Sequence, residues 1–130
     1  MNKVKVFLSK PILHKNGRII VFQKSKKINF NFKRVFVVKS GANQIRGRHA
    51  HKKCVQLLNC PYGKIKVFCE TKDNKKFSFV LNKSEKYLLV PKMTWCVQKY
   101  IKKNSVLMVI CSEKFSEQDY IRNYSKFLNS

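Results

Sequence analysis

Two histidines placed two residues apart are the side chains of this chain best suited to chemistry. His49 and His51 lie in the run Arg46-Gly47-Arg48-His49-Ala50-His51-Lys52. On an extended strand, side chains two residues apart point to the same face, which in a small β-barrel is the lumen. Imidazole changes its charge near neutral pH and therefore serves as a general acid or base. The pair predicts proton transfer inside a barrel.

The residues that follow resemble the cupin motifs but lack half of their metal ligands. Four residues separate His51 from Gln56 and six separate Gln56 from Gly63, with Gln56 at the position of a metal-binding acid. The second motif, Pro-x-Gly-x-x-His-x-x-x-Asn, is represented here by Pro91, Met93, Cys96 and Tyr100. Transition metals usually take three or four N, O or S ligands. We therefore expect no metal and no other cofactor. Zinc held by His49, His51 and Cys96 remains the alternative, against Cys96 as a small buried hydrophobe.

The formal net charge of +23 raises the question of nucleic-acid binding. Only five of the 29 basic residues are Arg, and the Lys pairs are scattered along the chain. Base readout and bidentate phosphate contacts depend mainly on Arg. We therefore interpret the charge as a solvated Lys surface that attracts an anionic small substrate, and we predict no nucleic-acid partner.

Length and composition predict one cytoplasmic domain over residues 1–130. No segment approaches the roughly 18 apolar residues of a membrane span, so no membrane partner is expected. The N-terminus lacks the apolar core and cleavage site of a signal peptide. The five cysteines are odd in number and form no CxxC pair, which indicates reduced thiols.

The elements that must position the histidines are strands. Short apolar runs bounded by turn residues predict strands at 4–8, 18–23, 34–39, 49–58, 64–70, 76–81, 87–90 and 105–111. Asn16-Gly17 predicts a tight hairpin. Ser116 with Asp119 three residues later predicts a helix start, and Tyr120, Tyr124 and Phe127 form its apolar stripe. We expect an all-β fold, a small cupin (jelly-roll) β-barrel with a short C-terminal helix.

Longer motifs resemble the cupin-type sugar 3,4-ketoisomerases over nearly the whole chain. The matching segments are Arg34-Val35-Phe36, Arg46-Gly47-x-His49-Ala50-His51-Lys52, Gln56, Pro91-x-x-x-Trp95 and Ser112-Glu113-x-Phe115-x-Glu117-x-Asp119-Tyr120-Ile121-Arg122-Asn123-Tyr124. The resemblance implies a metal-free homodimer whose N-terminal strands are exchanged between subunits. It also implies a dTDP-4-keto-6-deoxy-D-glucose substrate, used in making deoxyamino sugars for surface polysaccharides and antibiotics. Two departures are Phe36 and Val37, where the family commonly has Tyr, and Cys96, where it usually has His.

The implied reaction moves the keto group from C4 to C3 through a 3,4-enediol. His49 is the expected base at C3, and His51 is the expected partner that handles later proton delivery. Arg46 would orient a substrate oxygen or phosphate, and Gln56 is expected to contact the substrate. Arg34, Lys52 and Arg122 are expected to contact the diphosphate. Trp95 is expected to stack on thymine or sugar, although a plain core role suits it equally. The alternatives are a deoxysugar epimerase, a metal-dependent small cupin enzyme, or a non-catalytic barrel that binds nucleic acid or sugar.

Overall fold

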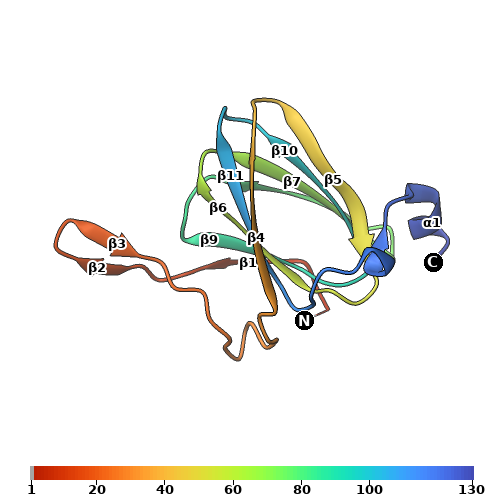
Figure 1. The fold of residues 1–130 in the computed structure, drawn as a ribbon, viewed down its shortest axis with the longest axis horizontal. Coiled ribbons are helices and arrows are strands. Elements are labelled where there is room, and N and C mark those ends of the chain that lie inside the picture. The colour runs from red at the N-terminus through yellow and green to blue at the C-terminus, as the bar shows by residue number, and fades with distance from the viewer. Residues whose placement is uncertain (1) are drawn as a thin grey trace.

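Two five-stranded antiparallel sheets face each other and form a barrel (Figure 1). The computed structural model describes residues 2–130. One sheet has the order β1-β9-β6-β11-β4 and the other β12-β5-β10-β7-β8. The bounds are β1 Lys5–Leu8, β4 Arg34–Ser40, β5 Gln44–His51, β6 Gln56–Tyr62, β7 Ile65–Thr71, β8 Lys76–Leu81, β9 Lys86–Val90, β10 Thr94–Tyr100, β11 Ser105–Cys111 and β12 Tyr120–Ile121. The expected all-β barrel is confirmed.

The remaining elements lie outside the two sheets. A separate hairpin of β2 (Ile12–His14) and β3 (Gly17–Ile19) projects away from the barrel, and α1 (Tyr124–Leu128) follows β12 at the C-terminus (Figure 1). A 3-10 helix, Glu117–Asp119, precedes β12. The expected short C-terminal helix is therefore confirmed. Among residues 2–130, no helix is long and apolar enough to cross a membrane.

The core lies between the two sheets, where alternate residues of each strand point inward. It includes Leu58, Val67, Leu88 and Val109, all essentially inaccessible to solvent. A smaller cluster lies around Phe127, which packs against Ala50 and partly buried Trp95. Burial of these apolar side chains stabilises the barrel that holds the site.

A β-bulge in β5 determines which of its residues face the lumen. In the pairing with β10, Cys96 lies opposite His49, but Val97 lies opposite Gly47, so Arg48 is an extra residue. Both Gly47 (φ 85°) and Arg48 (φ 61°) have left-handed backbone conformations. A side chain at residue 47 would have its Cβ 2.9 Å from the carbonyl oxygen of Cys96, so glycine is required here.

The bulge also aligns Arg46 with the histidine face. Arg46 and His49 are three residues apart and would point to opposite faces of a regular strand. Because the bulge inserts one residue, Arg46 pairs with Gln98 and His49 with Cys96, two residues of β10 that share one face. Arg46 and His49 therefore line the same cavity.

Two of the strand predictions were wrong in their bounds, and one strand was not predicted. The predicted strand 49–58 is two strands, because the chain turns from one sheet to the other between His51 and Gln56. The strand predicted at 18–23 ends at Ile19, and the hairpin turn is Lys15-Asn16, since Gly17 already pairs with His14. Strand β10 was missed because its inward positions include polar Thr94 and Gln98, which hide the apolar alternation.

The predicted helix start at Ser116 was also wrong. The Ser116 side chain makes no cap hydrogen bond. Tyr120 and Ile121 are extended because they pair with His51 and Ala50 of β5. The helix begins only at Tyr124, where the side chain of Asn123 accepts a hydrogen bond from the backbone of Lys126.

Candidate active site

A cavity of about 410 Å³ lies between the two sheets on the side of β4 and β5. His49, Arg46 and Tyr100 line it from the β5/β10 sheet, and Gln56 lines it from β6. Its other lining residues are Phe36, Val38, Ile45, Gly47, Gln98, Leu107, Val109, Tyr120 and Arg122. The cavity therefore has an apolar wall and a small set of converging polar groups, as ligand sites do.

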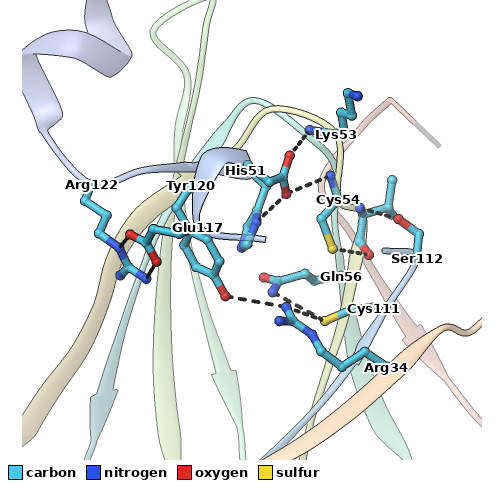
Figure 2. Close-up of polar contacts among 12 residues, drawn as sticks. Arg34, His51, Lys53, Cys54, Gln56, Cys111, Ser112, Glu117, Tyr120 and Arg122 are labelled. Carbon is cyan, nitrogen blue, oxygen red and sulfur yellow. Dashed lines mark hydrogen bonds and ion pairs between the residues drawn. The ribbon is translucent and has the colours of Figure 1, made fainter. Parts of the chain in front are cut away.

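Three aromatic side chains gather at one end of the cavity. The ring centroids of His49 and His51 are 5.0 Å apart, and Tyr120 lies 5.0 Å from His49 and 4.3 Å from His51. Figure 2 shows Tyr120 beside His51, with its hydroxyl directed toward Arg34. The prediction that both histidines lie on one inward face agrees with this geometry.

Asp119 fixes the orientation and the proton of His51. Its Oδ2 lies 2.9 Å from Nδ1 of His51. The same carboxylate accepts hydrogen bonds from the backbone amides of Lys53 (2.7 Å) and Cys54 (3.3 Å), which hold it in place. Because a carboxylate only accepts, Nδ1 of His51 carries the proton and Nε2 carries the lone pair. Nε2 is buried and has no hydrogen-bond partner among residues 2–130.

Both imidazoles are neutral at physiological pH. Burial, and after it the neighbouring His51, lowers the pKa of His49 to about 4. Burial also lowers the pKa of His51, although the bond to Asp119 partly opposes this effect. A neutral imidazole has a free lone pair, so each ring can accept a proton from a bound molecule.

Arg34 links the histidine cluster to a buried sulfur pair. Its Nη2 lies 3.4 Å from the Tyr120 hydroxyl oxygen and 3.4 Å from Cys111 Sγ (Figure 2). Hydrogen bonding from the Cys54 thiol, and then the Arg34 guanidinium, lowers the pKa of Cys111 to about 6. Gln56 also donates to this sulfur, at 3.7 Å. Arg34 thus lies between the Cys111 sulfur and the Tyr120 phenol at the edge of the cavity.

The structure brings most, but not all, of the predicted residues together. His49, Arg46, Gln56 and Arg122 line the cavity. His51 and Arg34 adjoin it through their contacts with Tyr120.

Lys52 and Trp95 lie elsewhere. Lys52 lines two hollows of the outer surface. Trp95 packs against Tyr124 and Phe127 of the C-terminal helix, with centroids 5.3 and 5.7 Å away, in the core role that was the alternative for it.

Sequence reasoning missed the parts played by Asp119, Tyr120 and Gln98. Asp119 and Tyr120 were interpreted as the start of a helix, although they are a 3-10 turn and a strand that pairs beside His51. Gln98 lies on the missed strand β10. Residue pairing across the barrel, which no local pattern encodes, places them at the site.

The side chains present do not form the metal site of a cupin. Within residues 2–130, the one group with metal-ligand spacing is His51, Cys54 and Asp119, whose ligand atoms lie within 4.8 Å of one another. His49 and Cys96 do not belong to it, so the zinc set of His49, His51 and Cys96 is not assembled. In the group of His51, Cys54 and Asp119, the side chains of His51 and Asp119 are hydrogen-bonded to each other.

Comparison with known proteins identifies the family of this chain. The family model described as FdtA: WxcM-like, C-terminal matches residues 2–130. A TDP-4-oxo-6-deoxy-alpha-D-glucose-3,4-oxoisomerase of Aneurinibacillus thermoaerophilus is 32% identical over 124 residues, covering 95% of this chain and 88% of that protein.

Two solved structures of the sugar 3,4-ketoisomerase QdtA from Thermoanaerobacterium thermosaccharolyticum have the same fold. The complex with TDP has a TM-score of 0.89 and 30% identity, covering 97% of this chain and 92% of that one. A histidine-to-asparagine variant in complex with TDP-4-keto-6-deoxyglucose has a TM-score of 0.90 and 28% identity, covering 99% and 94%. From the family match over residues 2–130, the chain belongs to the FdtA (WxcM-like, C-terminal) family, and the relatives compared with it are TDP-sugar 3,4-ketoisomerases.

Proposed function

We propose that this protein isomerises dTDP-4-keto-6-deoxy-D-glucose to the 3-keto sugar by histidine acid–base catalysis. The observation that carries the proposal is the pair of neutral imidazoles at one cavity, one of them oriented by Asp119. The relatives that act on this class of substrate support the choice of sugar.

His49 is the proposed base. The hydrogen on C3 is acidified by the adjacent C4 carbonyl, and His49 would remove it as a proton while the C3–C4 double bond forms. Negative charge then develops on the C4 oxygen. Transfer of the hydroxyl proton from O3 to O4 and delivery of a proton to C4 leave the carbonyl at C3. General acid–base catalysis of this kind contributes typically about 10²–10⁴-fold.

His51 is the proposed partner for the later proton movements. Its Nε2 lone pair is buried beside Tyr120, and Asp119 stabilises the imidazolium that forms when Nε2 takes a proton. The Tyr120 hydroxyl accepts from Arg34, which leaves its own proton free to stabilise an enediolate oxygen.

The basic residues of the cavity are the proposed contacts for the nucleotide diphosphate. Arg46 and Arg122 line the cavity, and Arg34 adjoins it. Arg122 is also held by two hydrogen bonds to Glu117, at 2.6 and 3.0 Å. Charge-assisted bonds of guanidinium to phosphate are strong and directional. A contact of Lys52 with the diphosphate stays a prediction, and it would lie outside the cavity.

We also propose a homodimer assembled through the N-terminal hairpin. Ile12, Leu13 and Ile19 are 53%, 74% and 50% exposed on β2 and β3, a two-stranded unit that is marginal in water by itself. The edge strand β4 exposes Val35 and Val37 in the same way. The hairpin would cover this apolar edge in a second copy.

Light scattering tests the dimer. We expect a mass of twice 15.4 kDa, and a monomer when Leu13→Glu places a charge on the hairpin. Leu128→Glu, on the exposed side of α1, is the matched control and should stay dimeric. A monomeric wild-type protein at micromolar concentration would contradict the assembly.

We propose that the reaction needs no metal and takes place in the cytoplasm. Activity should survive dialysis against a chelator, because His51 and Asp119 already hold each other by a hydrogen bond. Loss of activity that one divalent ion restores would overturn this part. The five free cysteines suit a reducing compartment.

The direct test of the proposed function is NMR of the product formed from dTDP-4-keto-6-deoxyglucose. The expected product carries its keto group at C3. A substrate changed only in configuration at C3 or C5 would favour the epimerase alternative instead. An unchanged substrate would refute the isomerase function.

A further inference from the structure

Tyr100 presents a buried hydroxyl to the cavity that nothing in the proposed reaction uses. It is the last residue of β10 and is completely buried. Its ring packs within the main core cluster, yet it lines the cavity together with Arg46, His49 and Gln98. Among residues 2–130, its hydroxyl oxygen has no hydrogen-bond partner.

A hydroxyl in this position requires an explanation. Buried polar atoms in proteins are hydrogen-bonded in the large majority of cases, because an unpaired one is costly. Phenylalanine would pack the same space without that cost. The hydroxyl is therefore best explained by a partner that arrives with the ligand.

The polar neighbours of Tyr100 indicate the chemistry of that partner. Burial raises the pKa of Tyr100 to about 12, so the phenol stays protonated and can donate a hydrogen bond. The amide oxygen of Gln98 does not accept from this hydroxyl, which has no hydrogen-bond partner among residues 2–130, and the amide nitrogen of Gln98 donates to Cys96 Sγ at 3.3 Å. Arg46, whose charge acts on the Tyr100 hydroxyl, pairs with Gln98 across the sheet and is the better group for phosphate.

We propose that Tyr100 forms a subsite in the cavity wall that binds an uncharged oxygen of the hexose. The phenol donates its proton to that oxygen, while Arg46 is left for charged oxygens. The subsite rests on the proposed function only in taking the ligand to be a TDP-linked hexose. It also means that Tyr100 acts as a donor and not as a base at neutral pH.

Calorimetry on Tyr100→Phe with two unreactive probes tests this assignment. The probes are TDP, which lacks the hexose, and TDP-6-deoxyglucose, which carries it without a ketone. We expect affinity for TDP-6-deoxyglucose to fall three- to tenfold, as for loss of one neutral hydrogen bond, and affinity for TDP to change less than twofold. The thermal midpoint should be equal or higher, since an unpaired buried hydroxyl is removed.

Tyr87→Phe is the matched control, because Tyr87 is also buried but stacks on Phe7 outside the cavity. It should bind both probes as wild type does. Unchanged affinity of Tyr100→Phe for TDP-6-deoxyglucose, or an equal loss for both probes, would overturn the subsite while leaving wild-type isomerisation intact. Failure of wild-type protein to bind either probe would instead refute the proposed function, and the subsite with it.

Discussion

The burial of His49 predicts that kcat/KM of the proposed isomerisation falls only at an unusually low pH. An imidazole with the ordinary pKa of 6.5 is about nine-tenths protonated at pH 5.5, so a base of that kind would lose about tenfold in rate. With its pKa lowered to about 4, His49 is only about 3% protonated at pH 5.5. We therefore expect kcat/KM to be almost unchanged between pH 7.5 and 5.5 and to fall only as the pH approaches 4.

The same shift affects stability, and its sign follows from proton uptake. Between pH 6.5 and 4, the unfolded chain binds a proton at residue 49 that the folded protein does not bind. The free energy of unfolding is therefore highest above pH 6.5 and falls as the pH decreases, by about 1.4 kcal/mol at pH 5.5 and by about 3 kcal/mol near pH 4. The lowered pKa of His51 acts in the same direction.

The assay is kcat/KM against pH, with circular dichroism at each pH to show that the protein is folded. His49→Asn should lose part of the acid destabilisation, because the residue no longer titrates. An acid limb of kcat/KM centred near pH 6.5 in folded protein would refute the reasoning that burial keeps His49 neutral.

Two further predictions concern the residues that support the site. Asp119→Asn should lower kcat about 10- to 100-fold with little change in KM, because an amide does not fix the proton of His51 on Nδ1 as the carboxylate does. Unchanged steady-state kinetics would contradict the role of this pair. Trp95→Ala should destabilise the protein by about 2–3 kcal/mol in chemical denaturation, because Trp95 packs on Tyr124 and Phe127. Its affinity for TDP in calorimetry should stay within twofold of wild type. Lost nucleotide affinity in a stably folded variant would instead show that Trp95 belongs to the binding site.

The fold and the two histidines were predictable because local patterns encode them. Alternating side chains place His49 and His51 on one face whatever their partners, and the apolar runs of β8 and β11 were assigned with their observed bounds. Strand β10 was not predictable in this way, because a lumen that holds a polar site requires polar residues at inward positions.

The supporting residues depend on contacts between distant segments. Asp119 reaches His51 across 68 residues of sequence, and Arg34 reaches Tyr120 across 86. The segment 116–124 satisfies helix signals locally, but pairing with β5 makes its middle extended. Tertiary pairing therefore overrides local preference at the place where the site is completed.

Exchange of the C3 hydrogen with solvent deuterium tests the central claim most directly. Wild-type protein and His49→Asn are incubated with dTDP-4-keto-6-deoxyglucose in D₂O and followed by proton NMR, with TDP affinity measured for both. We predict that wild type loses the C3 proton signal and forms the 3-keto product with deuterium at C4, whereas His49→Asn binds TDP normally and retains its C3 proton. A His49→Asn protein that exchanges C3 and isomerises at near the wild-type rate would contradict the assignment of His49 as the base.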